Sequence, residues 1–271
     1  MSKTPIVLVS ERVRGPRAGD APHPQIRGLL ARDYTSVTEP AAPSHDKVIP
    51  ATAAIGVILR LKGSSRLPPE FLVGAHDTCW GPEGACQQVA YMELWLAPLG
   101  AYRLLGLPIH TLSGQLVELT DVLGAGIRRL ADQLRDTPSR RQQFALLDEF
   151  LLRRAQDGPQ PAPEVVWAWR RLTATGGKLP IGRLAGEIGW SHKHLITRFT
   201  QQIGLPPKTA ARLVRFDTVW RRLAQRPPAR WDQIAAECGY ADQAHLIRDC
   251  RQFTGASPTA FLAYPHPQAQ T

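Results

Sequence analysis

Residues 184–204 read LAGEIGWSHKHLITRFTQQIG, and residues 234–255 read IAAECGYADQAHLIRDCRQFTG. These two stretches are copies of one pattern. They align at an offset of 50 residues up to Trp190 and Tyr240, and at an offset of 51 beyond one additional residue in the second copy. A match of this length indicates that the same supersecondary unit occurs twice in the chain.

Each copy is typical of a helix-turn-helix. Gly189 and Gly239 follow a short apolar-periodic segment, and glycine adopts the left-handed backbone conformation that ends a helix. Ser191 and Asp242 come two and three residues later, where a side-chain oxygen can cap the next helix. Any hairpin of two helices can show these features once. Their repetition favours a pair of helix-turn-helix units.

The segment between the copies, residues 207–225, predicts one helix. An apolar stripe runs along it, and an adjoining face is basic. The apolar residues are Leu213, Phe216, Trp220 and Leu223, and the basic residues are Lys208, Arg212, Arg215 and Arg222. At 1.5 Å per residue this helix is about 28 Å long, close to the ~34 Å between successive major-groove windows on one side of B-DNA. One chain is therefore expected to read two adjacent groove segments.

Residues 180–261 resemble the DNA-binding domain of AraC/XylS-type transcription regulators. The resemblance is carried by LAxEIGxS-x3-L-x3-F from Leu184 to Phe199, by LVRF at 213–216, by IAxECGYADQAHL from Ile234, and by the closing GxSP at 255–258. It implies a transcription regulator that binds double-stranded DNA in the cytoplasm, with RNA polymerase as a further partner. The family usually has an aromatic residue where this chain has Cys250, so Phe253 is expected to complete the second core.

Charge is distributed in agreement with that reading. The 271 residues carry a formal net charge of +10, and residues 160–271 hold 15 Lys and Arg against 7 Asp and Glu. Residues 1–159 hold 18 against 16. A basic C-terminal half beside a nearly neutral N-terminal half favours a phosphate-backbone partner for the former, although a basic balance also serves solubility.

Upstream of the repeat, the pattern changes to short strands. The runs at residues 34–38, 53–61, 71–75 and 89–95 are apolar or β-branched and are separated by Pro, Gly and Asp. Helices are predicted at residues 98–105, 127–135, 138–155 and 164–174. The fold class is thus α+β, with an N-terminal β-rich domain, a helical connector and a C-terminal all-α domain with two helix-turn-helix units.

The domain bounds follow from these patterns. We expect a loosely ordered segment at 1–25, a β-rich sensor domain at 26–125, a helical connector that bridges the domains at 126–156, a proline-rich hinge at 157–163, a DNA-binding domain at 164–264 and a tail at 265–271. The N-terminal domain is similar in element order to the cupin-like sensor of the family, mainly through residues 99–108 and 119–124. That resemblance implies a small-molecule effector and a homodimer formed through the N-terminal domain or the connector helices.

The candidate base-reading residues lie on the first two turns of each second helix, because that end of a recognition helix enters the major groove. They are His192, Lys193, Ile196, Thr197, Gln243, Ala244, His245 and Arg248. Lys193 and Arg248 suit guanine, and Gln243 suits adenine. His194 is expected to point inward. The alternative for each residue is a solvated helix face.

The candidate phosphate contacts are Arg212, Arg215 and Arg222 of the linking helix, together with the helix N-termini at Ser191 and Asp242. An alternative for Arg215 is an ion pair with Glu187 or Glu237. These assignments give a DNA interface composed entirely of the C-terminal domain.

Enzyme signatures are lacking in the sequence: it contains no GxxxxGK[ST], HExxH or GxSxG motif. We therefore expect no enzyme, no cofactor, no metal site and no membrane partner. One alternative function is an enzyme or redox factor tethered to the DNA-binding domain. In that case Cys79 and Cys86 would form a thiol pair, or His76 and Cys79 would be metal ligands. Another is a basic module that docks an acidic protein.

Overall fold

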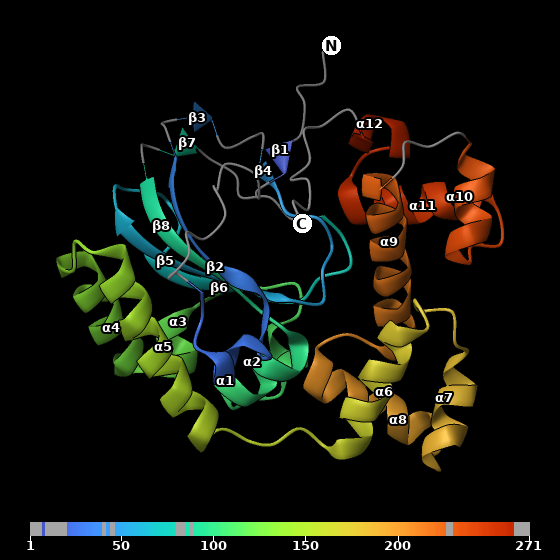
Figure 1. Ribbon diagram of the computed structural model, residues 1–271, viewed down its shortest axis with the longest axis horizontal. Coiled ribbons are helices and arrows are strands. Elements are labelled where there is room, and N and C mark those ends of the chain that lie inside the picture. The colour runs from blue at the N-terminus through green and yellow to red at the C-terminus, as the bar shows by residue number, and fades with distance from the viewer. Residues whose placement is uncertain are drawn as a thin grey trace.

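The computed structural model describes residues 7–8, 21–39, 42–43, 47–79, 85–86, 89–225 and 230–262. A β-sheet with helices packed on it forms the N-terminal half, and the C-terminal half is entirely helical in the described residues (Figure 1). The α+β fold class is therefore confirmed. Most of the predicted loose segment 1–25 and the whole predicted tail 265–271 lie outside the described residues.

The main sheet has five strands in the order β2-β8-β5-β6-β9, and all neighbours are antiparallel. Its strands are β2 (Leu30–Glu39), β5 (Ile55–Lys62), β6 (Glu70–Val73), β8 (Val89–Leu96) and β9 (Leu116–Glu118). The four strands predicted from periodicity are confirmed. The shorter strands β1 (Val7–Leu8) with β4 (Lys47–Val48), and β3 (Ala42–Pro43) with β7 (Ala85–Cys86), form two separate pairs.

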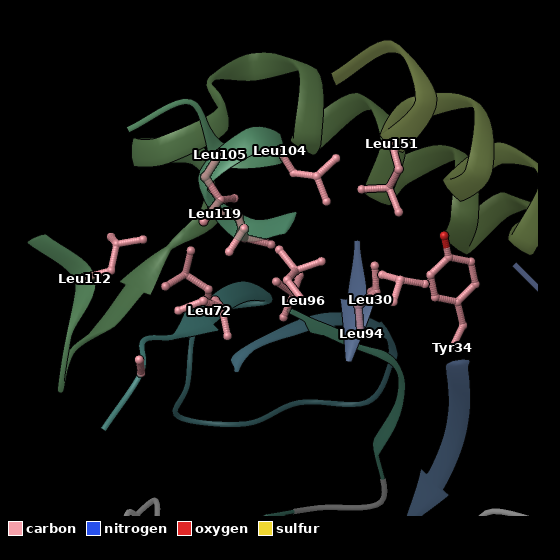
Figure 2. Close-up of a cluster of buried hydrophobic side chains, with 14 of the residues drawn as sticks. Leu30, Tyr34, Leu72, Leu94, Leu96, Leu104, Leu105, Leu112, Leu119 and Leu151 are labelled. Carbon is pink, nitrogen blue, oxygen red and sulfur yellow. The ribbon is translucent and has the colours of Figure 1, made fainter. Parts of the chain in front are cut away.

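One face of the sheet is covered by helices. These are α1 (Pro24–Arg27), α2 (Pro98–Leu105), α3 (Leu119–Leu123), α4 (Ala125–Asp136) and α5 (Arg140–Asp157), with a 3-10 turn η2 (Ile109–Leu112). Leucines from strands and helices meet in the core, as Figure 2 shows for Leu94 and Leu96 opposite Leu104 and Leu151. At its edge the Tyr34 hydroxyl donates to Asp148 Oδ1 on α5 at 3.1 Å.

The predicted role of the connector is corrected by this packing. Helices α4 and α5 do not bridge two domains, because their apolar stripe, including Phe144, Leu147 and Leu151, is buried against the sheet. A sheet that exposed Val57 and Leu59 to water would lose the apolar burial that stabilises it, and these helices provide that cover. The boundaries of the domains stay a prediction.

The C-terminal helices are α6 (Pro163–Ala174), α7 (Ile181–Ile188), α8 (His192–Ile203), α9 (Pro207–Gln225), α10 (Trp231–Cys238), α11 (Gln243–Thr254) and α12 (Pro258–Leu262). The long helix α9 connects a group formed by α6, α7 and α8 to a group formed by α10, α11 and α12 (Figure 1). Residues 158–162 connect α5 to α6. Gly158 in this connection packs closely against α2, because a Cβ added to it would lie 1.8 Å from the Arg103 carbonyl oxygen.

The two halves share one hydrophobic core. Leu205, Leu213, Phe216, Cys250, Phe253 and Phe261 from the helical half belong to the same buried cluster as the sheet. The first hairpin has a core of its own around Leu195 and Phe199, and the second around Ile234 and Leu246. In the parts of the chain that the structure describes, no helix combines the length and apolar character needed to cross a membrane.

Candidate DNA interface

The first hairpin has the geometry expected of a helix-turn-helix. Helix α7 ends at Gly189, which has φ +79°, and the Trp190 N–H donates back to the Ala185 carbonyl at 3.0 Å. The Ser191 hydroxyl then caps α8 by accepting from the His194 N–H at 3.2 Å. This left-handed glycine and the side-chain cap together fix the angle between the two helices.

The second hairpin repeats this arrangement. Gly239 has φ +81°, and the Tyr240 N–H donates to the Ala235 carbonyl at 2.8 Å. The Asp242 carboxylate accepts from the His245 N–H at 2.6 Å. The additional residue of the second copy, Ala241, is accommodated between the turn and the cap, so the two recognition helices α8 and α11 begin in the same way.

An aromatic residue of each turn packs edge-on against a histidine of the recognition helix. The ring centroids are 4.5 Å apart for Trp190 and His194, and 5.1 Å apart for Tyr240 and His245, each with an interplanar angle of 83°. His194 is exposed, so the prediction that it points inward is wrong. His194 aligns with His245 at the offset of 51. This alignment is the sequence signal that would have identified His194 as an outward-facing residue of the recognition helix.

The predicted base-reading residues occupy the open ends of both helices. Seven of the eight are exposed, and only His245 is half-buried by its contact with Tyr240. Ile196 is one of two exposed large hydrophobic residues among those described, with 36% of its surface accessible. Their side chains therefore face solvent on the turns that would approach a base edge, while their contact with DNA stays a prediction.

The three arginines predicted to bind phosphates instead make contacts with other residues of the chain. Arg212 pairs with Asp249 through Nη2 at 2.6 Å and lies over the Phe253 ring. Arg215 donates to the Gly177 carbonyl at 2.9 Å and lies over the Tyr240 ring.

Arg222 pairs with Glu237 at 2.7 Å. Each arginine thus joins α9 to a neighbouring element, and these contacts do not favour the predicted phosphate role.

The alternative partners of Arg215 are also corrected. Glu187 instead accepts from Arg171 at 3.2 Å and from Arg183 at 3.0 Å. The hydrogen bond from Arg171, followed in importance by that from Arg183, lowers the pKa of the Glu187 carboxyl below its ordinary value. Arg215 therefore binds backbone rather than a carboxylate, because Gly177 brings its carbonyl against α9.

The helix N-termini at Ser191 and Asp242 were the other predicted phosphate contacts, and the two capping side chains differ in how well they suit an anion. The Asp242 carboxylate already accepts from the His245 N–H, and its negative charge would repel a phosphate. Its side chain is therefore a poor phosphate ligand, although the backbone N–H groups of the first turn remain suited to one. The Ser191 hydroxyl carries no charge and leaves its helix N-terminus more favourable for an anion.

The cysteine chemistry considered from the sequence receives no support from the described residues. Cys79, Cys238 and Cys250 are free thiols, and burial raises the pKa of Cys250 to about 11, which keeps it protonated. Within the described ranges, no group of three or more His, Cys, Asp or Glu side chains is placed to hold a metal. The side chain of Cys86 lies outside the described set.

A cavity of about 750 Å³ lies between the sheet and the helical half. It faces the side of the sheet opposite α4 and α5, and its lining includes Arg32, Trp95, Trp169, Phe216 and Trp220. The Arg32 guanidinium lies over the Trp95 ring at 4.7 Å and pairs with buried Glu93 at 3.0 Å. Burial lowers its pKa, and its Nε is buried without a hydrogen-bond partner among the described residues.

Comparison with known proteins identifies the helical half. Residues 184–264 match the family model of a helix-turn-helix domain. The comparison with curated proteins finds no significant match.

Distant similarity to solved structures covers more of the chain. The C-terminal domain of AraT, a response regulator from Geobacillus stearothermophilus, is 17% identical with a TM-score of 0.38, over 42% of this chain and 94% of that one. ToxT from Vibrio cholerae O395 is 9% identical with a TM-score of 0.43, over 85% of this chain and 96% of that one. ToxT with a bound unsaturated fatty acid is 12% identical with a TM-score of 0.41, over 86% and 92%.

Proposed function

We propose that this chain, a DNA-binding transcription regulator with an AraC-type helix-turn-helix domain at residues 184–264, reads two adjacent major-groove segments. The observation that supports this proposal is the pair of equivalent hairpins in one chain. Both recognition helices are capped alike and present the side chains of their first two turns to solvent.

The base contacts are assigned to the eight exposed or half-buried residues of those turns. In α8 they are His192, Lys193, Ile196 and Thr197, and in α11 they are Gln243, Ala244, His245 and Arg248. We assign the phosphate contacts to the backbone N–H groups at the two helix N-termini and to exposed Lys208, in place of the engaged arginines of α9.

Selection of bound duplexes from a random library, followed by fluorescence anisotropy, tests this function. Specific binding is expected to weaken steeply as salt rises, because each neutralised phosphate releases a counterion. Binding that is absent, or that has the same affinity for selected and scrambled duplexes, would contradict the proposal.

Substituting Arg248 with alanine is expected to weaken binding to the selected site by about tenfold to a hundredfold, the value of one bidentate guanine contact. The loss should be confined to duplexes that keep one particular base, since a base contact carries sequence information and a phosphate contact does not. Anisotropy titrations on duplexes mutated at each position measure this. Arg251, also exposed on α11, gives the matched control Arg251→Ala, which should leave base preference unchanged. An equal loss on every duplex for Arg248→Ala would disprove the assignment.

Control by a small molecule is the second part of the proposed function, and the cavity between the two halves supports it. Its volume and tryptophan-rich lining suit an apolar or aromatic ligand. Arg32 lines this cavity with 37% of its side chain exposed, and its positive charge suits a carboxylate or another acceptor group. Because α6 and α9 form one wall, an occupant would contact the sheet and the DNA-binding half together.

The fluorescent anion 1-anilinonaphthalene-8-sulfonate is expected to bind the folded protein at one site, with blue-shifted emission. Ala54→Trp should weaken this signal, because an indole at that lining position occupies part of the cavity. Gly28→Trp serves as the control, since nothing lies within 4 Å of a Cβ at residue 28. Equal binding of the dye by both variants would place its site elsewhere and contradict the cavity as the ligand site.

A further inference from the structure

The last turns of both recognition helices are held by the N-terminal half. The final carbonyl groups of any helix have no partner within the helix and need one from elsewhere. At the end of α8, the Ser113 hydroxyl donates to the Gly204 carbonyl at 2.6 Å. At the end of α11, the Cys79 N–H donates to the Gln252 carbonyl at 3.3 Å and the Ala51 N–H donates to the Phe253 carbonyl at 2.8 Å.

A side-chain contact strengthens the second of these attachments. The Gln252 amide donates through Nε2 to the Asp77 carbonyl at 3.0 Å, and its Oε1 accepts from Arg212 at 2.7 Å. Gln252 therefore joins α11 both to α9 and to the N-terminal half. We refer to Ala51, residues 75–79 and Ser113 together as the clamp.

The two attachments of the clamp are connected by a short stretch of backbone. The Gly114 N–H donates to the Ala75 carbonyl at 2.9 Å, which fixes the loop carrying Ser113 to residue 75. Thr52 and His76 exchange two backbone hydrogen bonds of 2.9 Å, which fix Ala51 to the same stretch. The ends of α8 and α11 are thus attached to one rigid unit, although α9 and α10 separate the two helices along the chain.

We propose that the clamp sets the relative placement of the two recognition helices, and so determines which spacing of the two DNA half-sites the protein accepts. This inference rests on the proposed function. The caps lie at the opposite ends of α8 and α11 from the base-reading turns, so they fix direction without covering those turns. Ala51 and Thr52 also line the cavity, which puts its occupant in contact with the clamp.

The test measures spacing preference with the full-length protein. From the selected duplex, variants are made with one base pair inserted or removed between the half-sites, and the ratio of dissociation constants gives the spacing discrimination. Gln252→Glu keeps an acceptor for Arg212 but places a carboxylate oxygen against the Asp77 carbonyl. Ser113→Ala removes only the hydroxyl that caps Gly204. Each change should reduce the discrimination about threefold to fivefold, the net value of one hydrogen bond.

The repeat provides the matched control. Gln201 occupies the position of Gln252 in α8, and its Oε1 accepts from Arg198 of the same helix at 2.9 Å. Gln201→Glu makes the same chemical change away from the clamp and should leave the discrimination at the wild-type value. If Gln252→Glu does not fold, Ser113→Ala carries the test alone, because it removes one oxygen atom from a half-buried residue.

Two results would overturn the inference, and they are distinguishable. Tight binding of the selected duplex with wild-type discrimination in both Gln252→Glu and Ser113→Ala would show that the clamp does not control spacing, and would leave the proposed function intact. Failure of the wild-type protein to select any sequence would remove the proposed function and the inference together.

Discussion

Replacing Arg212 with alanine is expected to destabilise the protein by roughly 3–5 kcal/mol, the range measured when one partner of a buried ion pair is removed. Asp249 is only 1% exposed, and its Oδ2 already lacks a hydrogen-bond partner among the described residues. Without Arg212, its carboxylate would be buried without a countercharge. The aromatic contact over Phe253 would be lost as well. Equilibrium unfolding in urea, monitored by circular dichroism, measures the change.

Arg221 is the matched control for this prediction. It lies on the same helix and pairs with Asp217 at 3.0 Å, but both side chains are more than 60% exposed. Arg221→Ala should therefore cost less than about 0.5 kcal/mol. If Arg212→Ala unfolded at the same urea concentration as Arg221→Ala, the contact with Asp249 would not stabilise the fold.

Gly74→Ala is expected to destabilise the N-terminal half by about 3 kcal/mol or more, at the upper end of overpacking effects. A Cβ at residue 74 would lie 1.7 Å from the Leu112 carbonyl oxygen and 2.5 Å from its carbon. Both are backbone atoms, so the end of β6 and the loop carrying Ser113 would have to separate. The same substitution should also reduce the spacing discrimination, because that loop belongs to the clamp.

A second glycine provides the comparison for Gly74. Gly28 follows α1 with φ −69° and ψ −11°, and nothing lies within 4 Å of a Cβ placed there. Gly28→Ala is expected to change the free energy of unfolding by less than about 1 kcal/mol, in the stabilising direction, because alanine restricts the unfolded chain. Thermal unfolding of the two variants side by side checks both predictions, and equal midpoints would contradict the steric argument.

The helical half was predictable from sequence because its signals are local. A left-handed glycine, a cap two or three residues later and a periodic apolar stripe define each hairpin, and α9 spans the predicted residues 207–225 without change. Phe253 is fully buried against Phe216, but both residues belong to the core shared with the N-terminal half, so the expectation that Phe253 completes the core of the second hairpin is wrong.

The partners of charged groups were not predictable in the same way. Arg212, Arg215 and Arg222 lie on one basic stripe in the sequence, but each finds a partner 15 to 38 residues away, in an element whose position only the tertiary fold defines. The clamp was not predictable from the sequence either, because two of its three caps are backbone N–H groups that any residue other than proline would supply. Helices α4 and α5 were identified correctly, but periodicity does not reveal which surface an apolar stripe covers.

The two hairpins are equivalent in backbone and unlike in the side chains that they present. The proposed base contacts are His192 and Lys193 in one hairpin, and Gln243 and Ala244 at the corresponding positions of the other. A target recognised by such a pair cannot be its own inverted complement. A single molecule bound there would lie in one orientation only, so the DNA would gain a polarity, with the N-terminal half always on the same flank of the site.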